Sequence, residues 1–384
     1  MKLKMPKLSF ENIFLFSFFF YSYFFPLSIS EITGYFPVYN VMYLFRNISL
    51  LITILITILI FLKKWLLSRG WFKYLLISLV FFISGINAGI FQFFTLIIFC
   101  FFLNPMNFKR ILKALGLGNL LGAMTVILLS LIGFIPNDLI YDTGRYRMTF
   151  GFILPVLLPG IILNIGYVFV YLNRESITLK KIMVMLIPGL IIYIFARGRA
   201  SFFALVVILI GTHFTQKLTS DNRKQIIAFL VPLIKFIYVF SFLFSIYVGL
   251  NFEASTLLQS WNRFFTGRLG WISIYWNLYT PQLFGQYIIR VGQVLGRATG
   301  QEMMILDNAA LTLLLENGII VTAIFTWLLF SNLNRLKRTS DLASVLIWFA
   351  IIMTFPVANN GLWIWRNPLL FQFYFVISKE EELI

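Results

Sequence analysis

The sequence predicts an all-α fold: one polytopic transmembrane domain over residues 1–384 with one long extracytoplasmic loop. Three observations predict it. Hydrophobic residues make up 60% of the chain, and 45 of its residues are Phe. Charged residues make up only 12%, about half of the roughly 25% found in soluble domains. Apolar runs of membrane-spanning length recur along the whole chain. This composition excludes a soluble secreted enzyme, a DNA-binding domain and a disordered chain.

The apolar runs predict about 12 transmembrane helices. The third, fourth and seventh runs are short. The first is too long for a cleaved signal peptide, and no small-x-small cleavage site follows it, so we expect it to be retained. The runs span residues 10–30, 41–62, 71–86, 88–103, 114–134, 149–172, 182–196, 200–215, 226–250, 308–330, 342–358 and 364–378.

Lysine residues predict the orientation of these helices. Basic residues precede the first run and follow every even-numbered run, as at Lys63, Lys109 and Lys217. Because cytoplasmic loops are enriched in Lys and Arg, we expect these connections and both termini to be cytoplasmic. Lys235 is the exception, about nine residues into the ninth run. A lone Lys at that depth needs a partner, so we expect it to pair with Glu316 or a carbonyl oxygen.

The odd-numbered connections carry no Lys but ten Arg, against the positive-inside rule. Arg binds phosphate and carboxylate through a planar fork of donors. The net charge of +17 therefore divides into an orientation signal and an outer excess of Arg, and it does not indicate nucleic acid. Some of these Arg could instead contact lipid headgroups. They are Arg46, Arg145, Arg147, Arg197, Arg199, Arg263, Arg268, Arg290, Arg297 and Arg366.

Residues 251–306 form the longest outer connection. Its first half is amphipathic and aromatic, which predicts a helix on the membrane surface, broken near Gly267 or Gly270. Loops of this length are usually functional or disordered, and the aromatic residues argue against disorder.

Many of the outer charged residues lie in four short segments, which we call constellations. Residues 144–152 contain Arg145 and Arg147, and residues 196–201 contain Arg197 and Arg199 in a tight turn. Two Arg in so tight a turn between apolar runs are expected to lie below the level of the lipid headgroups. An Arg at that depth needs an anionic partner or a water-filled cavity. The simpler interpretations are an interfacial anchor for the first constellation and an internal ion pair for the second. The third constellation, residues 266–271, contains Arg268.

The fourth constellation is Asp307-Asn308 at the start of the tenth run, with Glu316-Asn317-Gly318 further in. In a continuous helix, Asp307 and Gly318 would share a face and Glu316 would point away. Asp and Asn both favour helix N-caps, so capping is the structural alternative to a catalytic role and does not exclude it.

These constellations resemble the O-antigen ligase and polymerase superfamily, specifically the Wzy-type polysaccharide polymerases. Arg147, Thr149, Gly151, Phe152 and Pro155 fit its R-x-[ST]-x-G-F-x-x-P motif, although Val156 stands where relatives commonly have Asn. The 198–201 segment fits a short Ser-Arg-small turn with Gly in the Ser place. Gly267, Arg268 and Trp271, one residue early, fit a G-R-x-x-x-W segment. Asp307-Asn308, nine residues and Gly318 fit a ligase motif that begins with His, and the Asp in that position points to a polymerase. The ordered set covers roughly residues 144–320.

The resemblance implies a glycosyltransferase of the bacterial cytoplasmic membrane that joins oligosaccharide repeat units linked to undecaprenyl pyrophosphate. It implies Asp307 as the base or orienter of the acceptor hydroxyl, with Glu316 in reserve, and Arg199 and Arg268 at the donor pyrophosphate. It also implies a flippase and a chain-length regulator as partners, and no cofactor. The remaining candidates for substrate binding are Arg145, Arg147, Arg197, Arg263, Arg290, Trp271, Trp276 and Asn308.

Two alternatives stay open, an O-antigen ligase and a flippase for lipid-linked oligosaccharides. A flippase would need polar groups along both halves of a central cavity, whereas the unusual charges here lie on one side. Cys100 and His213 are the only residues of their kinds. We therefore expect no intrachain disulfide and no thiolate or His-rich metal site.

Overall fold

The computed structural model describes residues 10–34, 38–65, 71–102, 108–142, 145–265, 267–290, 306–356, 358–364 and 366–378. In this part of the chain, seven helices are long and apolar enough to cross a membrane. The all-α membrane protein that the sequence predicts is thus confirmed as a class. The seven are α1 (Phe10–Ser28), α2 (Val38–Trp65), α5 (Phe108–Leu131), α7 (Leu179–Ala196), α8 (Arg199–Gln216), α9 (Ser220–Asn251) and α14 (Ile319–Thr339).

Shorter helices occupy the other apolar runs, so each of the twelve runs contains helix while the count of twelve spans stays a prediction. The tenth run opens with one α turn and one π-helical turn before α14. The shorter helices are α3 (Trp71–Ala88), α4 (Gln92–Phe102), α6 (Leu157–Leu172), α13 (Ala309–Leu311), η3 (Thr312–Asn317), α15 (Leu342–Met353), η5 (Pro368–Gln372) and α16 (Phe373–Ile377).

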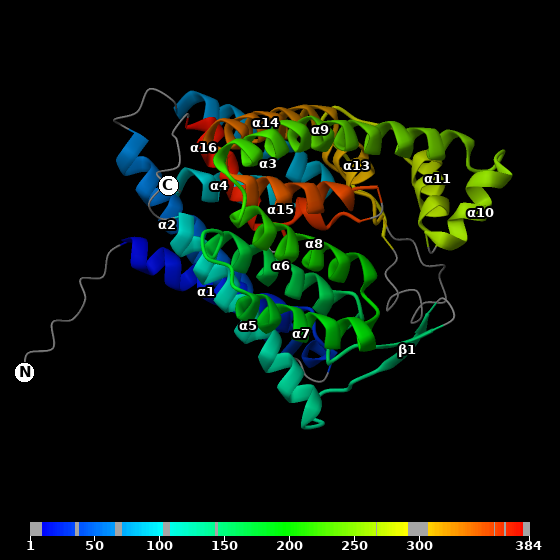
Figure 1. Ribbon diagram of the computed structural model, residues 1–384, viewed down its shortest axis with the longest axis horizontal. Helices are drawn as coiled ribbons and strands as arrows, with labels where there is room; N and C mark the ends of the chain where they lie inside the picture. Colours follow the sequence, from blue (N-terminus) through cyan, green and yellow to red (C-terminus); the bar gives the residue numbers. More distant parts are fainter. Residues whose placement is uncertain are drawn as a thin grey trace, which may run out of the picture.

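The bundle has two chemically different ends (Figure 1). At one end lie the start of α1 and the segment α16, together with the Lys-rich connections, and we call it the lysine end. The short helices α10 (Thr256–Phe264) and α11 (Arg268–Leu278) project from the other end, at which the turn between α7 and α8 also lies. A β-hairpin also lies there, and we call this the hairpin end.

Helix boundaries at the lysine end follow from N-caps in the sequence. The Thr178 side chain accepts a hydrogen bond from Lys181 N before α7, and Thr219 does the same for Asn222 N before α9. Asp341 caps α15 through Ser344 N and also pairs with Arg174 at 3.1 Å. Hydroxyl and carboxylate oxygens satisfy the free N–H groups of a first helical turn, so the Lys-rich connections end in defined turns.

The β-hairpin at the hairpin end corrects the purely helical prediction. Strands β1 (Leu139–Asp142) and β2 (Arg145–Met148) pair antiparallel, with Ile140 opposite Arg147. The hairpin closes where Asp138 N donates to Thr149 Oγ1 at 2.9 Å and Thr149 N donates to Asp138 O at 3.1 Å. Helix α6 therefore begins at Leu157 and not near residue 149. Arg147 lies in strand β2, well before the start of α6.

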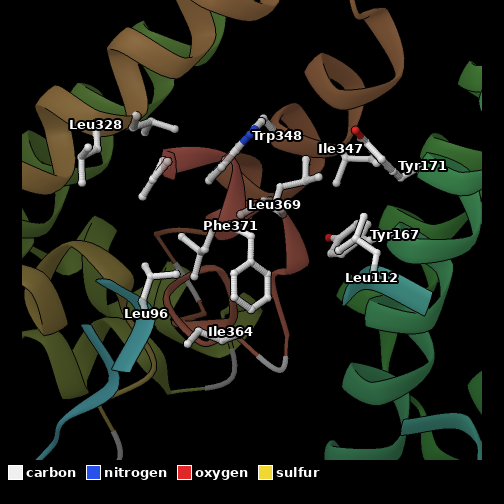
Figure 2. Packing of buried hydrophobic residues seen from close by; sticks show 14 of the residues in the cluster. Leu96, Leu112, Tyr167, Tyr171, Leu328, Ile347, Trp348, Ile364, Leu369 and Phe371 are labelled. Atoms are coloured by element: carbon white, nitrogen blue, oxygen red, sulfur yellow. The ribbon is translucent and has the colours of Figure 1, made fainter. Parts of the chain in front are cut away.

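The largest core lies around the C-terminal segment. Figure 2 shows Ile364, Leu369 and Phe371 between side chains of α4, α5, α14 and α15. A buried polar network fixes this segment, because Gln372 Oε1 accepts from Trp348 Nε1 at 3.2 Å and from Asn332 Nδ2 at 3.1 Å. Buried polar groups are stabilising only when they are paired. These hydrogen bonds fix Gln372 against α14 and α15.

The predicted ion pair between Lys235 and Glu316 is wrong. Lys235 Nζ donates to the side-chain carbonyl of Asn334 at 2.7 Å and lies 5.3 Å from the ring centroid of Phe330. Asn334 is near the end of α14 and Glu316 precedes its start, which separates them by roughly 25 Å of helical rise. The alternative partner, a carbonyl oxygen, matches the structure.

Candidate functional site

Helix α11 carries Arg268 at its first residue because the chain turns sharply after α10. Gly267 N donates to Asn262 O at 2.8 Å, and Asn262 Oδ1 accepts from Gly270 N at 3.1 Å. Gly267 has φ 83°, in the left-handed region. The predicted break in the aromatic helix is thus at Gly267, and it places Arg268 at the exposed start of the next helix.

Arg268 faces Asp307 across the hairpin end. The guanidinium Nη2 lies 3.8 Å from Asp307 Oδ2, and the two side chains are 35% and 40% exposed. This distance is an ion pair but exceeds a hydrogen bond. Both groups therefore keep donors and acceptors for a third species. The contact joins two constellations that the sequence could only place in order along the chain.

Asn308, not Asp307, caps the helix that follows. Its Oδ1 accepts from Leu311 N at 2.8 Å, while its Nδ2 donates to Ser245 Oγ at 2.9 Å and Pro356 O at 2.8 Å. The capping interpretation is confirmed for Asn308. Its amide is occupied within the protein, so a role of Asn308 in substrate binding stays a prediction. Asp307 is left free of the capping role.

The chain after α15 braces the Asp307 segment from the other side. Asn359 Nδ2 donates to Leu306 O at 3.1 Å, and Ala309 N donates to Phe355 O at 3.0 Å. The same segment carries Arg366, whose positive charge the nearby Asp307 carboxylate stabilises. Asp307 therefore pairs with Arg268 and lies within electrostatic range of Arg366, and the two guanidinium groups come from distant parts of the sequence.

The sequence did not single out Arg366 as a site residue. It counted Arg366 only among the ten outer Arg, because no motif surrounds it. Only the fold of the segment after α15, which follows from the core in Figure 2, brings it near Asp307.

Glu316 pairs with Arg290. Arg290 Nη2 lies 2.9 Å from Glu316 Oε2, and the Glu316 side chain is only 1% exposed. Glu316 sits in the π-helical turn η3, after which Gly318 adopts φ 93° and interrupts the helix. The continuous helix that would have placed Asp307 and Gly318 on one face is therefore absent. A buried carboxylate with a dedicated guanidinium partner serves better as a structural link than as a base.

The first two constellations also meet. Arg147 is buried in β2, and its Nε donates to Ala196 O, the last carbonyl of α7, at 3.0 Å. A guanidinium at a helix C-terminus satisfies carbonyls that have no partner within the helix. Arg197 follows with φ 56°, and Arg199 begins α8. Arg147 thus ties the hairpin to the turn that presents Arg197 and Arg199.

Arg197, Arg199 and Arg263 are exposed. Within the described ranges, no hydrogen bond or ion pair engages the three side chains. Arg145 opens β2, but its side chain lies outside the described residues, and Arg297 lies in the undescribed stretch 291–305. The depth of the turn between α7 and α8 in the membrane stays a prediction, and the alternative of an internal ion pair for Arg197 and Arg199 finds no carboxylate partner among the described residues.

The aromatic residues of α11 hold the neighbouring loop. Trp276 packs against α9 at Gly249, where a Cβ atom would lie 2.6 Å from the indole. Tyr275 donates its hydroxyl hydrogen to Ile289 O at 3.2 Å, and Ile289 N donates to Tyr279 Oη at 2.9 Å. Trp271 is half-buried in the same small core. The helix that carries the candidates Trp271 and Trp276 thus also positions residues 286–290.

Two adjoining hollows open between the helices at this end. A small cleft, with room for about one water molecule, lies between α6, α8, α15 and the segment after it, and its lining includes Gly160, Ser201, Thr354 and Arg366. An equally small groove lies between α6, α7 and α8 and is lined almost entirely by apolar groups. Leu163 and Ser201 line both hollows.

No protein-family model, no curated protein and no solved structure matches this chain. Among the residues that the structure describes, there is no group of three or more His, Cys, Asp and Glu residues arranged to hold a metal ion. The chemistry of the hairpin end is therefore what indicates the function.

Proposed function

We propose that the chain is a polysaccharide polymerase of a bacterial cytoplasmic membrane. In this proposal it joins oligosaccharide repeat units linked to undecaprenyl pyrophosphate on the outer face. The observation that carries the proposal is the ion pair between Arg268 and Asp307 at 3.8 Å, with Arg366 in electrostatic range of the carboxylate. The carboxylate offers a proton acceptor, and the neighbouring guanidiniums offer a site for a pyrophosphate leaving group.

The proposed reaction is a glycosyl transfer. The acceptor sugar hydroxyl of a new lipid-linked unit attacks the anomeric carbon of the growing chain. The bond between that carbon and the pyrophosphate oxygen breaks, and undecaprenyl pyrophosphate leaves. The hydroxyl proton passes to the Asp307 carboxylate. The guanidiniums stabilise the charge that develops on the leaving oxygen, and Trp271 on α11 is available to stack on a sugar ring.

Asp307 is the better candidate for the base because it is 40% exposed and held at 3.8 Å from Arg268, whereas Glu316 is buried and paired. An acceptor hydroxyl can reach a half-exposed carboxylate. Arg199 at the exposed start of α8 is the proposed second contact for the donor pyrophosphate, where the first helical turn adds a favourable potential for an anion.

Deletion of the gene, followed by a gel of the surface polysaccharide, tests the function. A polymerase predicts single repeat units on the final acceptor. A normal distribution of chain lengths that is not attached to the acceptor would indicate a ligase. Loss of all surface sugar would indicate a flippase.

Substitutions test the site. Lys keeps the charge of Arg but loses the planar fork, so Arg199→Lys and Arg268→Lys should shorten or abolish the polymer. Arg338→Lys at the lysine end is the matched control and should leave the polymer unchanged. Full-length polymer from both site variants at normal protein levels would contradict these assignments.

A further inference from the structure

Lys235 is a membrane-embedded cation that the proposed reaction does not use. It lies in α9, a helix of 32 residues that is apolar enough to span the membrane. Its ammonium group donates to Asn334 Oδ1 of α14 at 2.7 Å, and this partner is neutral. Among the described residues, no carboxylate forms an ion pair with Lys235. Because a Lys at membrane depth needs an anionic or strongly polar partner, the protein itself leaves this charge incompletely compensated.

Lys337 brings a second cation to the same seam between α9 and α14. It follows Asn334 by three residues on α14, and residues three apart share a helix face. Its positive charge acts on Lys235. Lys337 is exposed, and within the described ranges it has no carboxylate partner either. Like charges repel more strongly in a medium of low dielectric constant, so an anion that contacts both ammonium groups removes an unfavourable interaction.

Toward the bilayer centre the seam is closed. The Phe330 ring centroid lies 5.3 Å from Lys235 Nζ, and one turn further along α9 the hydroxyls of Tyr238 and Thr326 share a hydrogen bond at 2.8 Å. These two hydroxyls satisfy each other and carry no charge. A site for an anion is therefore restricted to the part of the seam nearest the lysine end, where the two ammonium groups and the Asn334 amide meet.

The depth of this part of the seam suits the headgroup of a lipid. Helix α14 has 21 residues, and its rise of about 31 Å matches the hydrocarbon thickness of a bilayer. Asn334 and Lys337 lie within about 8 Å of its end at Thr339. Trp327 precedes Asn334 by seven residues on the same helix face and is 48% exposed. An acyl chain that leaves the seam toward the bilayer centre therefore meets an aromatic surface.

We propose that the seam binds an anionic phospholipid of the leaflet at the lysine end, with the phosphate between Lys235 and Lys337 and an acyl chain along Trp327. Basic pockets between transmembrane helices are suited to anionic headgroups. A zwitterionic lipid carries an ammonium group of its own, which adds to the repulsion between the two Lys, so the site prefers a lipid with a net negative charge. The site lies at the opposite end of the bundle from Asp307 and does not depend on the polymerase proposal.

Native mass spectrometry of the purified full-length protein in detergent tests the site with phosphatidylglycerol and phosphatidylcholine of identical acyl chains. The fraction of protein that retains one lipid gives an affinity at least about fivefold higher for phosphatidylglycerol. Lys235→Gln and Lys337→Gln each weaken phosphatidylglycerol binding by about fivefold, and both together weaken it by about 25-fold. Lys180→Gln, which removes the same charge from the first turn of α7, changes neither affinity.

Two further comparisons separate the headgroup from the acyl chain. Trp327→Ala weakens both lipids alike, because it removes apolar surface and no charge, and unchanged binding of both lipids to this variant overturns the placement of the acyl chain. Inorganic phosphate at millimolar concentration leaves phosphatidylglycerol bound. Complete displacement by inorganic phosphate would identify a site for a free anion and overturn the lipid assignment. Equal affinity of the wild-type protein for the two lipids overturns it as well, and that comparison needs no variant.

Thermal unfolding in detergent provides an independent measurement. A ligand that binds only the folded protein raises its Tm. Phosphatidylglycerol therefore raises the Tm of the wild type and of Lys180→Gln, but not that of the double variant with Lys235→Gln and Lys337→Gln. An equal rise in the double variant would assign the stabilisation to the general membrane surface, and the seam would not be the site.

Discussion

At the scale of single residues, Asp307 and Asn308 are adjacent but have different surroundings. Asn308 is 2% exposed and uses its amide to cap α13 and to reach Ser245 and Pro356. Asp307 is 40% exposed at its side chain and faces Arg268. Although one sequence motif contains both residues, Asn308 has a structural role, and Asp307 is the residue available for chemistry.

Paired substitutions test this division. Asn308→Ala removes a cap and two buried hydrogen bonds, so it should lower the free energy of unfolding by about 2 kcal/mol or more. Asp307→Asn should leave thermal stability in detergent nearly unchanged while polymerisation of purified lipid-linked units falls by at least about 100-fold. A native rate for Asp307→Asn would remove Asp307 from the mechanism. Asn308→Ala serves as the control for general damage at this position.

Glu31 gives a pH-dependent prediction near the hairpin. It follows α1, and its backbone N donates to Gly151 O at 2.8 Å. Burial raises the pKa of Glu31, and the nearby Asp138 carboxylate raises it further. The folded protein therefore favours the protonated form. The associated stability is present below the usual pKa of a Glu carboxyl and is lost as the pH rises through the raised value.

Glu31→Gln should consequently stabilise the protein at pH 8 and have little effect at the acidic end of the titration. Thermal unfolding of the wild type and the variant in detergent, measured across pH 4–8, checks this. The difference in Tm should grow with pH. A difference that is constant with pH would show that Glu31 does not titrate with the inferred shift.

At the scale of elements, Gly285 and Gly318 form a close backbone contact that fixes the start of α14. Gly318 has φ 93° and ψ 167°, a region that only glycine readily adopts. A Cβ atom at Gly318 would lie 2.2 Å from Gly285 N. Ile319 N and Ile320 N donate to the carbonyls of Gln282 and Leu283, and thereby cap the helix. The long loop is thus attached to the site by its backbone.

Gly318→Ala should destabilise the protein by more than about 3 kcal/mol, because strain and a backbone clash combine. Gly133→Ala is the matched control: its φ of 76° gives similar strain, but nothing lies within 4 Å of the added Cβ. That variant should lose only about 1–2 kcal/mol. Thermal unfolding in detergent measures both. Equal losses would mean that the contact with Gly285 contributes little.

The elements that the sequence predicted are those with a strong local signal. Apolar runs and polar caps such as Thr178 and Thr219 depend on neighbouring residues alone, and helices appear in all twelve runs. The sequence did not predict the hairpin at 139–148, because its two short strands lie between long apolar runs that dominate the pattern. The π-helical turn before Gly318 was missed because a helical pattern does not reveal a change in hydrogen-bond period.

The site was predicted in its parts but not in its pairing. Motifs indicated Arg147, Arg268 and Asp307, and the resemblance implied Arg268 at the donor pyrophosphate and Asp307 at the acceptor hydroxyl. The contact between Arg268 and Asp307 and the approach of Arg366 depend on how the segments before and after α15 pack. Contacts of this kind are not encoded in local spacing, so the sequence could not rank Arg366 above the other outer Arg.

At the scale of the whole molecule, the two ends satisfy their charges differently. At the lysine end, Arg110 pairs with Glu11 and Arg174 pairs with Asp341. At the hairpin end, exposed Arg197, Arg199 and Arg263 accompany the looser pair of Arg268 and Asp307. The hairpin end also holds the tight pair of Arg290 and Glu316, and its exposed Arg forks are suited to an external anion. The proposed function requires that this end face outward.

Cysteine labelling decides the orientation, and the chain offers a simple background because its only Cys, Cys100, is buried. In a Cys100→Ala protein, Tyr141→Cys in the exposed hairpin should react with a membrane-impermeant maleimide in spheroplasts. Arg338→Cys at the lysine end should react only after permeabilisation, since Lys-rich connections face the cytoplasm. Labelling of both in detergent controls for reactivity. The reverse labelling pattern would place the Arg-rich end in the cytoplasm. Because the proposed reaction takes place on the outer face, that result would contradict the polymerase proposal.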